Sequence, residues 1–163
     1  MVLMNGSGKM EAFLENAGML YDLMGITPLL YGSLGLQYLT GNDLSADDID
    51  MLIPGEFVGA RWAQFTQVLE AQGYVLIDEH EHTFEKGGIH YAYAQIEGLE
   101  SFAGIRMDEI KTVCEKNVRF KLLSLEQYLS VYTASSKDGY RMNVKEKRDM
   151  EKIALIKKKM HKE

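Results

Sequence analysis

Two short stretches, LYGS at residues 30–33 and DIDMLIP at residues 48–54, indicate how this chain folds. The first ends an apolar run at a Gly-Ser step, and the second is an apolar run that opens with alternating carboxylates. In a β-strand, residues i and i+2 point to the same face, so Asp48 and Asp50 are expected to project together. Two carboxylates held side by side repel each other unless a cation lies between them. Hard oxygen ligands of this kind suit Mg²⁺.

The Gly-Ser step predicts a phosphate-binding turn. A short helix is expected from Leu34, with Ser33 as its N-cap. A helix N-terminus presents unpaired N–H groups and the positive end of the helix dipole, and Gly32 has no side chain to keep a phosphate from the backbone. A phosphate site followed, after a spacer of 14 residues, by an Asp-x-Asp strand is the outline of a nucleoside triphosphate site. The alternative is an ordinary helix cap and two solvated aspartates.

These residues, YGS at 31–33 and DIDM at 48–51, resemble the signature of the polymerase-β-type nucleotidyltransferase superfamily. The pattern is similar to that of the small antibiotic (lincosamide-type) and abortive-infection toxin nucleotidyltransferases. Two later segments, LSLE at 123–126 and KRD at 147–149, look like further elements of its smaller members, so the resemblance touches most of residues 29–155. It implies an α/β (α+β) nucleotidyltransferase fold, in which helices flank a mixed sheet and a helical C-terminal part follows.

The resemblance also implies an activity, the transfer of a nucleoside monophosphate from an NTP to a hydroxyl acceptor. The acceptor would be a small molecule or a macromolecule, and the cofactor would be Mg²⁺, with Mn²⁺ as the alternative metal. Gly32 and Ser33 would bind the phosphates of the nucleotide. Asp48 and Asp50 would be both catalytic residues and metal ligands, neutralising charge on the leaving pyrophosphate.

A third acidic residue and a basic helix would complete such a site. Glu97 ends an expected strand at 89–97 and is the candidate base for the attacking hydroxyl, although a hydrophobic-Asp-hydrophobic pattern is not cleanly present there. In the last helix, expected at about 143–160, Lys145 and Lys147 would bind the triphosphate, oriented by Asp149. The alternative for this helix is a solvated face with i,i+4 ion pairs.

Two other functions remain open at this stage. The chain could be a catalytically degenerate nucleotidyltransferase fold that binds a nucleotide or a partner, as the pattern around Glu97 suggests. It could also be a toxin-like protein that modifies RNA or another protein, with the basic C-terminal helix as its contact with RNA. The net charge of −6 argues against a polyanion-binding face over the whole protein.

Composition sets the outer bounds. The 163 residues, 46% hydrophobic and 26% charged, predict a single globular domain, with residues 1–9 as a flexible lead-in and 124–163 as a helical extension. A single cysteine, Cys114, excludes an internal disulfide and a multi-cysteine zinc site, and we expect it to be a small, at least half-buried hydrophobe. Without an apolar run of about 20 residues, no membrane segment is expected, and the cytoplasm is the default compartment.

The remaining segments are assigned by periodicity. Helices are expected at 10–24 and 57–72, each with an apolar stripe and the second with Gly73 as its C-cap, and at 124–134, with Ser124 as its N-cap. Strands are expected at 29–31, 74–86 and 118–122, and a loop with one helical turn at 99–115. Gly87-Gly88 predicts a two-residue hairpin turn. If the strand before it is regular, Asp78, His80 and His82 share one face, where a His-x-His zinc site is the alternative to exposed polar residues.

Overall fold

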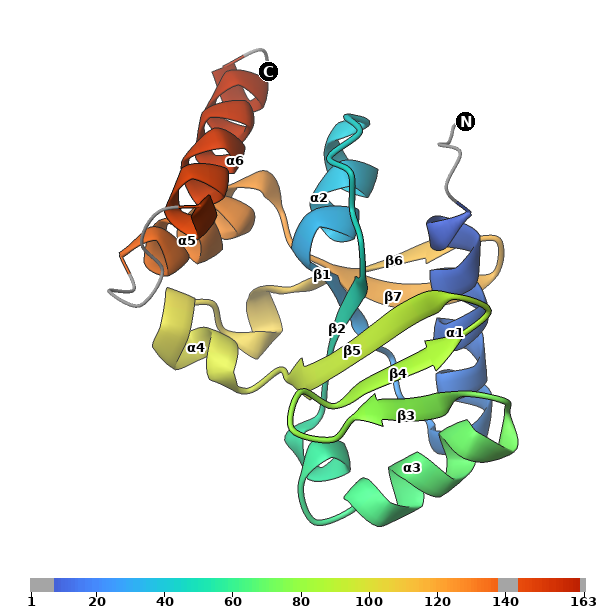
Figure 1. Cartoon of the computed structure of the whole chain (residues 1–163). Helices are drawn as coiled ribbons and strands as arrows, with labels where there is room; N and C mark the ends of the chain where they lie inside the picture. The colour runs from blue at the N-terminus through green and yellow to red at the C-terminus, as the bar shows by residue number, and fades with distance from the viewer. Residues whose placement is uncertain (1–7, 138–143, 162–163) are drawn as a thin grey trace. The chain divides into compact units, whose positions relative to one another are not determined.

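The computed structural model describes residues 8–137 and 144–161, with the backbone alone for residues 144–147. Its described part contains one mixed sheet of seven strands and six α-helices (Figure 1). The elements follow in the order α1 (Lys9–Met24), β1 (Leu29–Tyr31), α2 (Gly32–Thr40), β2 (Ile49–Ile53), the 3-10 helix η1 (Gly55–Val58), α3 (Trp62–Ala71), β3 (Val75–Asp78), β4 (Thr83–Lys86), β5 (Ile89–Gln95), α4 (Gly98–Ala103), η2 (Met107–Glu109), β6 (Lys111–Glu115), β7 (Val118–Leu122), α5 (Leu125–Ser136) and α6 (Val144–His161).

The chain divides into two compact units. The first contains the chain up to Glu97 together with Thr112–Leu122, and the second contains Gly98–Lys111 and the residues from Leu123 onward. The first unit holds the sheet with α1, α2 and α3, and the second holds α4, α5 and α6. The predicted α+β class with a mixed sheet is confirmed. No helix in the described ranges is both long enough and apolar enough to cross a membrane.

The sheet brings the two signature stretches together. Its strand order is β3-β4-β5-β2-β1-β7-β6. The strand β1 runs antiparallel to β2, with Tyr31 opposite Asp50, and parallel to β7. The other neighbour of β2 is β5, which runs parallel to it. Because β1 ends where β2 begins, the Gly-Ser step and the two aspartates meet at one end of the central strand pair.

One face of the sheet carries the main hydrophobic core of the first unit. The alternation expected for β2 is confirmed, since Ile49 and Met51 are fully buried while Asp50 is half-buried. The helices α1 and α3 cover this apolar face, and both predicted stripes contribute buried residues. The largest side chains of this core are aromatic: Phe13, Phe57, Phe65, Tyr74, Phe84, Tyr91, Tyr93 and Phe120. Asp50 therefore points away from the face that carries Ile49 and Met51, although Leu52, which follows on the Asp50 face, is buried as well.

The end of α2 is tied to the strand β6, which sequence periodicity did not predict. The Tyr38 hydroxyl on α2 donates a hydrogen bond of 2.7 Å to Glu115 Oε1 on β6, and the Tyr38 ring lies edge-on to Phe120 at 5.7 Å. Residues 99–115, expected to be a loop with one helical turn, in fact form α4, η2 and β6. Cys114 lies on this edge strand and is exposed, so the expectation of a half-buried cysteine was wrong.

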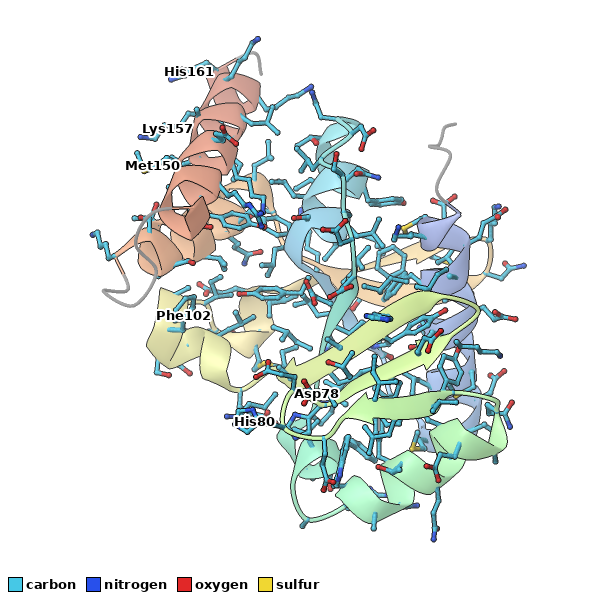
Figure 2. The ribbon with its side chains drawn as sticks, viewed as in Figure 1. Asp78, His80, Phe102, Met150, Lys157 and His161 are labelled. Atoms are coloured by element: carbon cyan, nitrogen blue, oxygen red, sulfur yellow. The ribbon has the colours of Figure 1, made fainter. Side chains whose placement is uncertain are left out.

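The segment expected as one long strand at 74–86 is a hairpin. Its arms are β3 and β4, and the turn between them places Asp78 and His80 at the surface (Figure 2). His82 has φ 51°, which breaks the regular alternation, and its ring packs against Trp62 at 4.7 Å. The three polar residues therefore do not form a strand face, and the zinc alternative fails. The Gly87-Gly88 turn into β5 is confirmed, with φ 60° and 80°.

Other helix boundaries differ modestly from expectation. The helix expected at 57–72 is split into η1 and α3, with Gln72 rather than Gly73 as the C-cap. The predicted Ser124 cap is confirmed, because its hydroxyl accepts from Gln127 N at 3.1 Å and Gln127 Oε1 accepts from Ser124 N at 2.9 Å. Residues 1–7 of the expected lead-in lie outside the described residues, and Lys9 already belongs to α1.

The Tyr38–Glu115 contact predicts a specific titration. Burial first, and then the hydrogen bond and the charge of Glu115, raise the pKa of Tyr38 from 10.0 to about 12. Because the folded-state pKa is raised, the contact stabilises the fold fully below pH 10 and is lost as the pH rises through 12. The absorbance titration at 295 nm of wild type minus Tyr38→Phe should show one tyrosine ionising near pH 12, and Glu115→Gln should lower that midpoint. A difference curve centred at pH 10 would contradict the contact.

Candidate functional site

Gly32 lies directly against the carboxylate of Asp50. Tyr31 pairs with Asp50 across the antiparallel strands, and Gly32 turns the chain into α2 with φ 67°. A Cβ built on Gly32 would lie 2.6 Å from Asp50 Oδ2 and 3.3 Å from Asp50 Cβ. Glycine is required here on two counts, because the left-handed φ disfavours other residues and the carboxylate fills the space of a side chain. The N-terminal end of α2 and the Asp50 side chain thus form one compact site.

Ser33 does not have the capping role expected of it. The helix begins at Gly32, its N-cap is Tyr31, and the Tyr31 side chain makes no capping hydrogen bond. The left-handed turn at Gly32 starts the helix two residues earlier than predicted, so Ser33 falls within the first turn. No acidic residue occupies that first turn, so nothing within it offsets the positive end of the helix dipole. A role for Gly32 and Ser33 in phosphate binding remains a prediction.

The two aspartates lie at the start of β2 in different surroundings. Asp50 is half-buried within the strand, whereas Asp48 is exposed and precedes its first residue. His90 comes from the neighbouring strand β5, and its Nδ1 lies 3.8 Å from Asp48 Oδ1. Sequence reasoning did not include His90 in the site. The parallel pairing of β2 with β5 would have been needed to find it, because this pairing places Ala92 beside Asp50 and His90 two residues before it.

Glu97 is not brought to the aspartates. The strands β2 and β5 run parallel away from Asp50, and Gln95, the last residue of β5, is already three positions beyond Ala92. Three positions correspond to about 10 Å along a strand, and Glu97 follows still later in the chain. There Glu97 Oε1 accepts a hydrogen bond of 2.9 Å from the backbone N–H of Gly55. The expectation that Glu97 supplies the third carboxylate therefore disagrees with the structure, which instead places Ala92 beside Asp50.

The basic helix belongs to the second unit. The side chains of Lys145 and Lys147 lie outside the described residues, so their predicted contact with the triphosphate stays a prediction. Asp149 is buried, 2% exposed, and accepts a hydrogen bond of 2.7 Å from the Ser135 hydroxyl on α5. Asp149 is therefore not part of a solvated helix face, and its expected ion pair with Lys145 lies outside the described residues. The exposed side of α6 includes Met150, Lys157 and His161 (Figure 2).

The oxygen atoms of Asp48 and Asp50 could bind Mg²⁺ only together with the phosphate oxygens of a substrate. In residues 8–137 and 144–161, no group of three or more His, Cys, Asp or Glu side chains could hold a metal ion by itself. Mg²⁺ characteristically takes one or two protein carboxylates, several waters and the phosphate oxygens of a substrate. Asp48 and Asp50 beside the start of α2 match that requirement, since the protein would provide two oxygen donors and the substrate would provide the phosphate oxygens.

Comparison with solved structures identifies the fold. The structure is similar to a nucleotidyltransferase-like protein from Paracoccidioides brasiliensis, with a TM-score of 0.66 and 15% identity, over 92% of this chain and 76% of the other. It is also similar to ANT(2″)-Ia in complex with adenylyl-2″-tobramycin, with a TM-score of 0.59 and 13% identity, over 93% and 90% of the two chains. The protein has the nucleotidyltransferase fold that the signature residues predicted.

Sequence comparison identifies the family. The chain is 39% identical over 133 residues to the uncharacterized protein YnaI of Bacillus subtilis (strain 168), covering 82% of this chain and 85% of YnaI. The chain belongs to the same family as YnaI. No protein-family model matches it.

The contact between Gly32 and Asp50 predicts the cost of an added methyl group. Gly32→Ala should destabilise the fold more than Gly41→Ala, since both glycines have a left-handed φ but nothing lies within 4 Å of a Cβ at Gly41. The shared backbone strain is about 1–2 kcal/mol, and the displaced carboxylate should add about 1–3 kcal/mol. Urea unfolding of the two variants measures the difference. Equal losses would show that the carboxylate moves aside freely.

The position of Glu97 predicts a structural effect without a catalytic one. Glu97→Ala removes the acceptor for Gly55 N–H and should lower the free energy of unfolding by about 1 kcal/mol. Glu97→Gln keeps an acceptor oxygen, so its stability and its nucleotide binding should match those of wild type. If Glu97→Gln kept its stability but lost nucleotidyl transfer, the carboxylate would be acting in catalysis and the structural reading would be wrong.

Proposed function

We propose that this protein transfers a nucleoside monophosphate from an NTP to a hydroxyl acceptor, with Mg²⁺ or Mn²⁺ as its cofactor. The observation that carries the proposal is the contact of the Gly32 backbone with the Asp50 carboxylate, where a Cβ would lie 2.6 Å from Oδ2. This arrangement combines a helix N-terminus, which favours phosphate, with a carboxylate that favours a divalent cation. The fold shared with nucleotidyltransferase-like proteins supports the proposal.

Each residue has a separate task in this proposal. The N–H groups at the start of α2, around Gly32 and Ser33, bind the terminal phosphates of the nucleotide. Asp48 and Asp50 hold the metal, which when bound withdraws charge from the phosphate and the leaving pyrophosphate. The strand pairing of Asp50 with Tyr31 fixes its distance from the helix, so that phosphate and carboxylates meet without a large rearrangement. Lys145 and Lys147 of α6 are the proposed further contacts with the triphosphate.

A small hydroxyl compound is the acceptor type that the comparisons favour. The solved structure of ANT(2″)-Ia is a complex with adenylyl-2″-tobramycin, a small molecule that carries an adenylyl group. By analogy of fold, the acceptor of this chain would present a hydroxyl group to the α-phosphate beside Asp48 and Asp50. The analogy concerns the kind of acceptor and does not extend to a particular compound.

A second candidate function follows from the residue beside Asp50. On β5 the paired position is Ala92, and Glu97 is occupied with Gly55 N–H beyond the far end of the strand. A fold with two aspartates and an alanine in that place could bind a nucleotide without transferring it. The chain would then act as a nucleotide-binding module, and nucleotide binding would occur without release of pyrophosphate.

A thermal-shift panel separates these functions. Wild type, Asp50→Asn and the control Asp22→Asn, which makes the same change at an exposed position of α1, are heated with each of the four NTPs, with and without Mg²⁺. A ligand at a hundredfold excess over its Kd stabilises the folded state by about 2.7 kcal/mol, which is roughly 5–10 °C in Tm for a chain of this size. We expect a Mg²⁺-dependent rise in wild type and Asp22→Asn that is lost in Asp50→Asn.

Each outcome of the thermal-shift panel supports or contradicts a different function. A rise followed by pyrophosphate release with a hydroxyl acceptor supports the transferase, and a rise without pyrophosphate release across an acceptor panel supports the binding module. Loss of folding in Asp50→Asn, seen as a loss of the native circular dichroism spectrum, would show that Asp50 is structural. A full rise retained in folded Asp50→Asn would remove the aspartates from the site.

A further inference from the structure

The segment between α2 and β2 connects the two halves of the proposed site. The helix α2 starts at Gly32, where phosphate would bind, and the chain must return from its far end to deliver Asp48 to the start of β2. Residues 41–47 make this return without regular secondary structure. Asp50 is held by strand pairing, but Asp48 precedes the strand and is exposed. Asp48 has His90 3.8 Å away, and Ala46 of the loop packs against the core, so the position of Asp48 depends both on these contacts and on how the rest of the connecting loop is held.

A single residue of α2, Gln37, holds the loop at two points. Its backbone carbonyl accepts from Gly41 N at 2.8 Å, and its side-chain Oε1 accepts from Leu44 N at 2.9 Å. The first bond closes the helix at Gly41, whose φ of 78° is the usual left-handed end of a helix. The second reaches seven positions along the chain to the middle of the loop. Gln37 is half-buried, which protects the second bond from water.

The other hydrogen bonds of the loop are local. Thr40 Oγ1 donates to Leu36 O and accepts from Asn42 N at 3.2 Å, and Asp43 Oδ1 accepts from Ser45 N at 2.9 Å. These bonds shape the turn that follows the helix, but none of them joins the second half of the loop to α2. The side chain of Gln37 makes that connection at Leu44, which lies four residues before Asp48.

We propose that Gln37 is a positioning residue for the metal site, setting Asp48 relative to Asp50 and the start of α2. This inference rests on the proposed function, because it assigns Gln37 to the same nucleotide and metal site. The side-chain bond holds the loop against the helix that binds the phosphates. Loss of the bond leaves Asp50 in its strand and gives Asp48 a wider range of positions, which weakens the response of the site to Mg²⁺.

Three variants test the role of the side-chain acceptor. Gln37→Met keeps the length of the side chain and removes the acceptor, whereas Gln37→Glu keeps an acceptor oxygen. Gln67→Met makes the same substitution at an exposed position of α3 and is the matched control. For each variant we measure the Tm without ligand, the Mg²⁺ concentration that gives half of the NTP-dependent stabilisation, and the Kd of the nucleotide without Mg²⁺.

We expect Gln37→Met to raise the half-saturating Mg²⁺ concentration about three- to tenfold, the effect of losing one backbone hydrogen bond. The Kd of the nucleotide without Mg²⁺ should not change, and Gln37→Glu should restore Mg²⁺ affinity to within about twofold of wild type. A fall in Tm with an unchanged Mg²⁺ requirement would show that Gln37 is merely structural and would overturn the inference. Asp50→Asn tests the proposed function separately: if it leaves Mg²⁺-dependent binding intact, the site itself is wrong, whatever Gln37 does.

Discussion

The close contact between a backbone and a carboxylate is the constraint on which the site depends. Gly32 can lie against Asp50 because it has no side chain and because it adopts a left-handed φ of 67°. That conformation turns the chain directly from β1 into α2, without the serine cap that the sequence suggested. The same antiparallel pairing that sets Tyr31 opposite Asp50 also fixes the helix start relative to the carboxylate. The pairing of the two strands thus determines both where the helix starts and where the carboxylate lies.

The two ends of β2 serve different purposes. Its start carries the aspartates and lies beside the beginning of α2. Beyond its far end, Glu97 Oε1 accepts a hydrogen bond from Gly55 N, and Gln95 Oε1 lies close to the same glycine. Between them, Ile49, Met51 and Ile53 are fully buried in the aromatic core on the opposite face. A strand anchored by its apolar face and its far end can hold two carboxylates at its start, because repulsion between them cannot move the strand.

Local patterns predicted what local physics determines. The β1 run, the α1 stripe, the Gly87-Gly88 turn and the Ser124 cap depend on neighbours in sequence, and all four are confirmed. The predictions were wrong where contacts between segments distant in sequence determine the structure. The strand β6 forms because β7 pairs beside it. The prediction for Glu97 fails because alternation along β5 does not reveal its parallel register with β2. That register puts His90 near Asp48 and Ala92 beside Asp50, so the aspartates were predictable and their partners were not.

The difference between the two aspartates bears on how the site would work. Asp50 is half-buried, paired in a strand and in contact with the Gly32 backbone, so its position is set by the fold before any ligand binds. Asp48 is exposed, lies before the strand and has His90 3.8 Å away. Under the proposed function, Asp50 would define the metal site, and Asp48, placed by the connecting loop, would supply the second oxygen ligand. The burial pattern of β2 supports the proposed nucleotide site more strongly than the presence of two aspartates does.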